Sequence, residues 1–248
     1  MAKYYFHLVT LFDRHRIHSY VVEFSRLAIQ FAHASPTDGT QIRAEMRNRQ
    51  FNSAVAVSNF DAAHSALLAM TDPAVQKSSL RKLVEKMCES CHATELAALP
   101  FASLSTAVGE ILELKSRGSV DVGRGVPYHQ ILYSWRISRN DYRGASSVLL
   151  DRIHKLKAAG EGDRLIGEDV LDTPVTRHYL LLINALSCVD PKQAWVFSEP
   201  QAKEGGKKEK RKVVTLADVR TGYQEELDRI AAIQNNQFGF GDEDAMEI

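Results

Sequence analysis

The pentapeptide Cys88-Glu89-Ser90-Cys91-His92 carries the most specific chemical pattern in this sequence. C-x-x-C-H is the attachment signature of a c-type haem, and Cys88, Cys91 and His92 could also bind zinc with a distant fourth ligand. Both cysteines, however, continue an apolar stripe at helical spacing, formed by Leu80, Leu83, Val84 and Met87. Small thiols are ordinary core residues in such a stripe, and no export signal for haem attachment is visible. We therefore expect two buried, reduced thiols without metal or cofactor, and keep a haem electron carrier as a remote alternative.

Other patterns that would indicate catalysis are missing from the sequence. The nine histidines are scattered, and neither an H-E-x-x-H pair nor a G-x-S-x-G serine turn occurs. No G-x-x-x-x-G-K-[ST] or G-x-G-x-x-G loop indicates nucleotide binding. The carboxylates stand singly on polar helix faces, where solvation explains them better than acid–base chemistry. We expect a protein that is not an enzyme.

The charge balance limits the possible partners. Lys plus Arg and Asp plus Glu are each 31, so no overall field attracts nucleic acid or an anionic membrane. No apolar run approaches the roughly 20 residues that cross a bilayer, which predicts no membrane insertion. Residues 203–212 carry a net charge of +4 around a Gly-Gly pair and predict a disordered loop, with a nuclear localisation or phosphate-binding strip as the alternative. Binding is therefore expected from local protein surfaces.

Proline and apolar periodicity predict an all-α chain. Asp72-Pro73, Thr173-Pro174 and Asp190-Pro191 each combine an N-cap residue with a proline at the first helical position, and each predicts a helix start. Apolar residues recur at helical spacing in ten segments. The expected helices span about residues 4–14, 17–34, 40–57, 60–70, 73–91, 102–116, 127–138, 141–158, 174–187 and 215–236. Residues 195–197 and 212–214 favour a small β-hairpin.

The short connections between these helices predict an irregular α-solenoid of about ten antiparallel helices. The three residues 139–141 allow only a helix hairpin, which Trp135 and Tyr142 should lock while Gly144 brings the two backbones close. No fixed repeat period is visible, which disfavours regular arrays. The expected organisation is a helical stack over 1–199, a basic disordered insert over 200–213, a C-terminal helix packing on the stack over 214–237, and an acidic flexible tail over 238–248. The chain has the character of a piece of something longer.

The segment 128–145, YHQILYSWRISRNDYRGA, resembles the C-terminal half of a scaffold nucleoporin. The family is that of the one-hundred-and-sixty-kilodalton vertebrate and one-hundred-and-twenty-kilodalton fungal nucleoporins of the nuclear pore's Y-shaped outer-ring complex. Residues 3–28, 59–63 and 214–227 are similar as well, so the resemblance spans nearly the whole chain. It implies a nuclear pore protein at the nuclear envelope, with a β-propeller preceding an α-solenoid of which this is the latter part.

The resemblance also implies partners. The C-terminal region of this family meets two helical nucleoporins at the hub of the Y, the short-arm nucleoporin and the stalk nucleoporin with a WD-repeat cap. The implied role is structural support of nucleocytoplasmic transport. A vesicle-coat or other adaptor solenoid is the alternative, because a tyrosine and alanine after a tight turn also occur in those coats.

The last helix is the expected partner surface, because a solenoid end without a successor leaves an apolar groove for another helical end. One apolar face of this helix is formed by Leu216, Val219, Tyr223, Leu227 and Ile230, with Ile233 nearby. Tyr223 is the preferred anchor, since aromatic residues dominate interface energies. Arg220, Glu225, Glu226 and Arg229 are expected to form polar surface.

Overall fold

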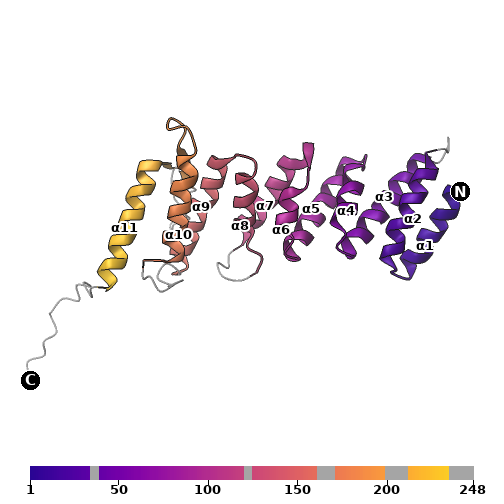
Figure 1. The fold of residues 1–248 in the computed structure, drawn as a ribbon, viewed down its shortest axis with the longest axis horizontal. Coiled ribbons are helices and arrows are strands. Elements are labelled where there is room, and N and C mark those ends of the chain that lie inside the picture. The colour runs from indigo at the N-terminus through magenta and orange to yellow at the C-terminus, as the bar shows by residue number, and fades with distance from the viewer. Residues whose placement is uncertain (34–38, 120–124, 161–170, 199–211, 235–248) are drawn as a thin grey trace, which may run out of the picture. The chain divides into compact units, whose positions relative to one another are not determined.

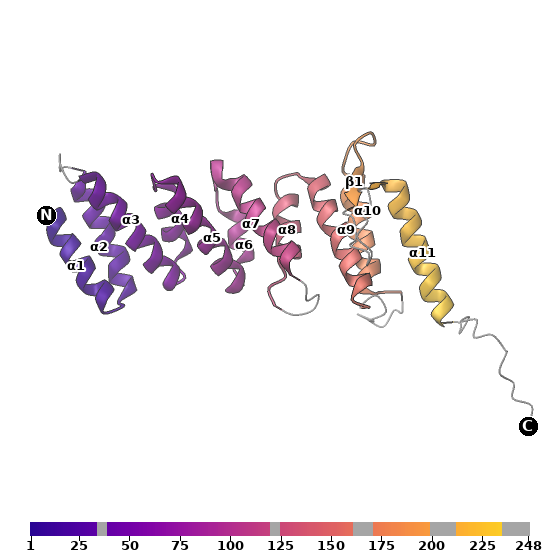
Figure 2. The ribbon, with the colours of Figure 1, turned by 180° about the vertical axis from the view of Figure 1, so that it is seen from behind.

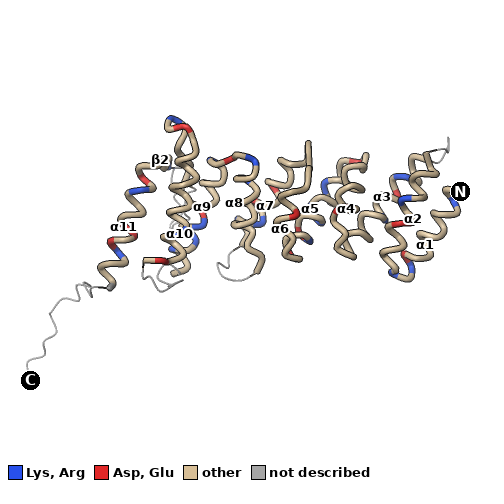
Figure 3. Tube along the Cα trace, in the orientation of Figure 1, with Lys and Arg blue, Asp and Glu red and all other residues tan. Residues whose placement is uncertain are grey.

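The computed structural model describes residues 1–33, 39–119, 125–160, 171–198 and 212–234, and nearly all of them are helical (Figure 1). Within each unit, helices that follow one another along the chain pack side by side, which confirms the all-α solenoid class expected from the sequence. The chain divides into two compact units, Met1–Lys115 and Ser116–Ile248, and this division falls inside the stack expected over 1–199. Basic and acidic residues are scattered along the described helices of both units (Figure 3).

The first unit is a run of helices in which each helix from α1 to α5 contacts the next one along the chain. Its elements are α1 (Ala2–Arg14), α2 (His18–Ala32), α3 (Gly39–Ala56), α4 (Phe60–Leu68), α5 (Pro73–Glu89), α6 (Ala93–Ala98), a 3₁₀ turn (Ala102–Leu104) and most of α7 (Ser105–Gly118). Asp72 caps α5 as expected, since its Oδ1 accepts hydrogen bonds from the backbone N–H of Ala74 and Val75. The six-residue helix α6 was not predicted, because it is too short for apolar periodicity to show.

The second unit packs three long helices and a hairpin around one core. Its elements are α8 (Tyr128–Ile137), α9 (Tyr142–Ala158), α10 (Pro174–Ser187), β1 (Trp195–Ser198), β2 (Lys212–Thr215) and α11 (Leu216–Gln234). The core is formed by buried residues from α9, α10, β1 and α11, namely Leu149, Leu150, Ile153, Leu156, Val175, Tyr179, Leu182, Leu186, Val196 and Val219. Lys155 of α9 also donates to the carbonyl of Ser116, which caps the end of α7.

The predicted β-hairpin is present, and Figure 2 shows β1 beside α9 and α10. Its antiparallel strands pair Trp195 with Thr215 and Ser198 with Lys212. Arg143 of α9 holds β1, because its guanidinium lies 3.5 Å from the Trp195 ring centre and its Nε donates to the Trp195 carbonyl at 3.0 Å. Residues 199–211 and 235–248, with most of the basic insert and the whole acidic tail, lie outside the described residues.

Two predictions about turns are wrong. Asp190-Pro191 opens no helix: residues 191–193 form a turn before β1, in which Asp190 accepts from the backbone N–H of Lys192. Gly144 does not serve close approach of two backbones, because a Cβ there would collide with the carboxylate of Asp141, 2.0 Å from its Oδ2. Asp141 is the N-cap of α9 and accepts from the Gly144 N–H, so this glycine makes room for the cap.

Candidate interaction site at the C-terminal helix

Hydrogen bonds between the end of β2 and the first turn of α11 define where this helix begins. The carboxylate of Asp218 accepts from both the backbone N–H and the hydroxyl of Thr215, and the Asp218 N–H donates to the Thr215 hydroxyl oxygen. This reciprocal arrangement is a capping box with aspartate in place of glutamate. The hydrogen bonds from Thr215 hold the pKa of Asp218 below its ordinary value. The strand therefore leads directly into the helix.

The six residues expected to bind a partner lie on the inner and flanking sides of α11. Val219 and Ile230 are 2% and 5% exposed, so their side chains are buried within this chain. Leu216 and Tyr223 are half-buried against the core, with the Tyr223 ring 6.2 Å from that of Tyr179. Leu227 and Ile233 are also half-buried. The chain itself therefore uses much of this face, and Tyr223, Leu227 and Ile233 keep some accessible apolar surface.

The outer side of α11 is polar. Its exposed residues are Ala217, Asp218, Arg220, Thr221, Gln224, Glu225, Asp228 and Arg229. A polar outer face is also what the capping repeats of repeat proteins present to solvent. Among the described residues, α11 therefore has the character of a capping helix with an apolar margin.

The prediction that Glu226 forms polar surface is wrong, because this residue is only 3% exposed. Its Oε2 lies 2.9 Å from the Nζ of Lys157 on α9, and its Oε1 lies 2.6 Å from the Nη2 of Arg229. Lys157 also donates to the hydroxyl of Tyr179 at 3.2 Å. Burial acts to raise the pKa of Glu226, but the hydrogen bonds from Arg229 and Lys157 outweigh it and lower the pKa. The ion pair between Glu226 and Lys157 therefore holds α11 against α9.

Gly222 explains how α11 comes so close to α10. A Cβ at this position would lie 3.2 Å from the hydroxyl oxygen of Tyr179 and 3.5 Å from its ring. These distances are at or below the limit of ordinary contact, so glycine is the residue that lets the helix pack directly on Tyr179.

The C-x-x-C-H segment is not assembled into a site. Cys88 is 4% exposed, and burial raises the pKa of its thiol to about 12. Cys91 is exposed, which makes the prediction of a buried thiol wrong: α5 ends at Glu89, and Cys91 adopts a φ of 62° after the helix. His92 bonds to Glu95 and packs its ring against Phe60. Within the described residues, no cluster of three or more His, Cys, Asp or Glu side chains could hold a metal ion.

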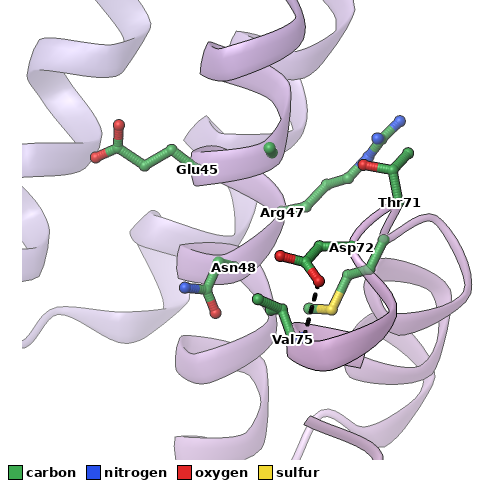
Figure 4. Close-up of a pocket in the computed structure, with 8 residues that line it drawn as sticks. Glu45, Arg47, Asn48, Thr71, Asp72 and Val75 are labelled. Carbon is green, nitrogen blue, oxygen red and sulfur yellow. Dashed lines mark hydrogen bonds between the residues drawn. The ribbon is translucent and has the colours of Figure 1, made fainter. Parts of the chain in front are cut away.

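An open hollow of about 250 Å³ lies between α3 and the turn into α5 (Figure 4). Glu45, Arg47, Asn48 and Val75 contribute to its lining. Asp72 also lines it, but its carboxylate is committed to capping α5, and the dashed line marks the hydrogen bond that it accepts from the Val75 N–H. The hollow therefore has no convergent set of polar groups that would define a ligand site.

Two half-buried histidines lie close together, His129 on α8 and His178 on α10. The rings of His129 and His178 lie 6.0 Å apart, near Arg152 and Lys155. Burial, followed by the charges of Arg152, His178 and Lys155, lowers the pKa of His129 to about 3. Burial likewise lowers the pKa of His178.

We expect the free energy of unfolding to fall as the pH drops from 7 to 5. The unfolded chain protonates His129 near pH 6.5 and the folded chain does not, so the stability present above pH 6.5 is lost below it. If the folded chain did not protonate His129 at all, the free energy of unfolding would be about 2 kcal/mol lower at pH 5. Because the ring is only half-buried, we expect a loss of about 1 kcal/mol. Urea titrations of wild type and His129→Gln at both pH values check this. Identical pH dependence in the two proteins would contradict it.

None of the described helices is both long and apolar enough to cross a bilayer. Antiparallel helices that bury their faces on their neighbours define an α-helical repeat protein.

Comparison with known proteins places this repeat protein in a family. The family model for the HEAT repeats of nucleoporin Nup120 matches residues 1–89. Nucleoporin NUP120 of Chaetomium thermophilum is 41% identical across 100% of this chain, which covers 27% of that relative. Nucleoporin nup120 of Schizosaccharomyces pombe is 25% identical over 79% of the chain and 17% of the relative, and nuclear pore complex protein Nup160 of Mus musculus is 28% identical over 71% and 12%.

The chain belongs to the Nup120/Nup160 family of nucleoporins, which confirms the resemblance seen in the sequence. It spans about a quarter of the length of the Chaetomium thermophilum relative.

Proposed function

We propose that this chain is a non-catalytic scaffold segment of the nuclear pore complex at the nuclear envelope, where it binds other helical nucleoporins and supports nucleocytoplasmic transport. The observation that carries the proposal is the 41% identity to a nucleoporin over the whole chain. The helical stack supports it, because such folds offer large surfaces for other helical proteins and few enclosed pockets.

The proposed partners are the short-arm nucleoporin and the WD-repeat-capped stalk nucleoporin at the hub of the Y-shaped complex. The proposed contact is the apolar margin of α11, centred on Tyr223, Leu227 and Ile233. Val219, Ile230 and Leu216 support this margin from the core side, because they fix α11 on α10. Half-buried apolar side chains beside a polar face are the kind of surface that a partner helix completes.

The test is co-elution of the chain with the two partners after Ile233→Asp or Leu227→Asp. A charge placed in a contact that becomes dry should weaken binding by about tenfold or more, equivalent to about 1.4 kcal/mol. Thr221→Asp is the matched control, because Thr221 is exposed on the polar side of the same helix. Circular dichroism must show that each variant is folded.

Undiminished binding by both folded variants would move the contact away from α11. Co-purification with vesicle-coat subunits instead of nucleoporins would overturn the proposed function and favour the adaptor solenoid. Neither outcome depends on the stability of the isolated chain.

A further inference from the structure

The β1–β2 hairpin is apolar on both of its faces. On the inner face, Val196 is 2% exposed and Val214 is half-buried against the core of the second unit. The opposite face, called here the outer hairpin face, carries Trp195, Phe197 and Val213. Side chains alternate between the two faces of a strand, and an antiparallel sheet with one face on a core commonly exposes polar residues on the other. The hairpin departs from that pattern.

The outer hairpin face is accessible and continuous. Phe197 and Val213 stand opposite each other in the two strands and are 48% and 46% exposed. The half-buried Trp195 lies beside them, with its ring centre 5.0 Å from that of Phe197 in edge-to-face geometry. Single exposed apolar residues are common on protein surfaces, whereas a contiguous set of them marks an interaction site.

The sequence that joins the two strands has the wrong composition to cover this face. Residues 199–211 contain no aromatic residue, leucine, isoleucine, valine or methionine. No described element covers Phe197 or Val213, as their exposure shows. An exposed aromatic side chain next to a half-buried tryptophan is the kind of anchor that contributes most to binding energy at an interface. An occupant with apolar side chains of its own would therefore gain by binding here.

Positive charge stands at both ends of the outer hairpin face. At one end the guanidinium of Arg143 lies over the Trp195 ring, and Arg143 forms no ion pair within the described part of the chain. At the other end Lys212 is exposed at the start of β2. Asp218 is near Lys212, but its carboxylate already accepts hydrogen bonds from Thr215. Carboxylates on the occupant would complement the two cations.

We infer that the outer hairpin face binds an extended acidic peptide segment of another protein, with apolar side chains at alternate positions. Alternate side chains of an extended peptide are about 6.8 Å apart, which is also the spacing of alternate residues such as Trp195 and Phe197 along β1. Two strands about 4.8 Å apart form a narrow strip, which suits an extended peptide better than a helix about 10 Å across. This inference does not rest on the contact proposed above for α11.

Fluorescence anisotropy of a labelled synthetic peptide, titrated with the whole 248-residue chain, tests the inference. The probe alternates aspartate with phenylalanine and leucine, and the control probe has lysine in place of aspartate. We expect the lysine probe to bind at least about tenfold more weakly than the acidic probe. Phe197→Ser should weaken binding of the acidic probe by about tenfold or more, and Lys212→Gln by about threefold. Leu180→Ser is the matched control, because Leu180 is 46% exposed on α10, and it should leave binding unchanged.

Hydroxyl-radical footprinting of the wild-type chain is a second measurement that needs no substitution. Phe197 should react as an exposed residue without the acidic probe and be protected with it, while Leu180 stays reactive in both cases. Undiminished binding by folded Phe197→Ser, equal binding of the lysine probe, or no binding at about 1 mM would overturn the inference. Low reactivity of Phe197 in the free chain would also overturn it and show that this chain covers the face itself. Protection that increases with protein concentration would overturn it in favour of a second copy.

Discussion

Trp135→Ala is expected to lower the free energy of unfolding by about 3–5 kcal/mol. The indole of Trp135 on α8 is 3% exposed, and α8 packs on α9. The guanidinium of Arg139 lies 3.1 Å from its ring centre and covers its outer side. The alanine side chain would leave a cavity that the stiff helix hairpin cannot close.

Urea unfolding of wild type and Trp135→Ala measures this loss. Trp195→Ala is the comparison, because that ring is only half-buried under Arg143 and its loss should cost less. The Trp195→Phe variant leaves Trp135 as the single tryptophan, whose fluorescence iodide should quench weakly. Strong quenching, together with a small stability loss, would show that Trp135 is an exposed residue and a candidate binding anchor.

Lys157→Met is expected to destabilise the docking of α11 by about 2–4 kcal/mol, since it leaves the buried Glu226 carboxylate with Arg229 as its remaining basic contact. Methionine retains the length and apolar stem of lysine, so the change removes mainly the charge. Exposure of part of Lys157 to solvent places the effect below that of a fully buried pair. Limited proteolysis within α11 should become correspondingly faster.

The double variant Lys157→Met/Glu226→Leu distinguishes the interaction between Lys157 and Glu226 from the contacts that each residue makes with other groups. Replacing both charges by apolar groups should recover most of the lost stability, because no uncompensated charge stays buried. A double-mutant cycle measured by urea unfolding gives the coupling energy directly. A coupling near zero would show that Glu226 is held by Arg229 alone and that Lys157 plays no part in fastening α11.

The sequence predicts local structure well where one helix face is apolar over several turns. The starts of α5 and α10 follow from Asp72 and Thr173, whose side chains cap the backbone as predicted. The caps Asn59 of α4 and Asp141 of α9 are seen only in the structure. Cys91 was assigned to a helical stripe because periodicity alone does not reveal that α5 ends two residues earlier.

The candidate site was harder to predict, because it depends on contacts between distant helices. Glu226 is seven residues after Val219 and four before Ile230, and this spacing alone indicates the inner side of α11. Because glutamate is charged, the sequence alone favours an exposed position for it. Lys157 carries no comparable signal, since nothing in a single sequence relates a lysine at the end of α9 to a glutamate 69 residues later. Charge pairs across helices require the fold itself.

The outward backbone groups of the β1–β2 hairpin are partly blocked against pairing with strands of other molecules. A two-stranded sheet presents outward backbone groups on which strands of other molecules can add. Here the Trp195 carbonyl of β1 is taken by Arg143, and the Thr215 N–H of β2 is taken by Asp218. At these two positions the sheet offers no template for an incoming strand. The same side chains that anchor the hairpin thus protect it against edge-to-edge aggregation.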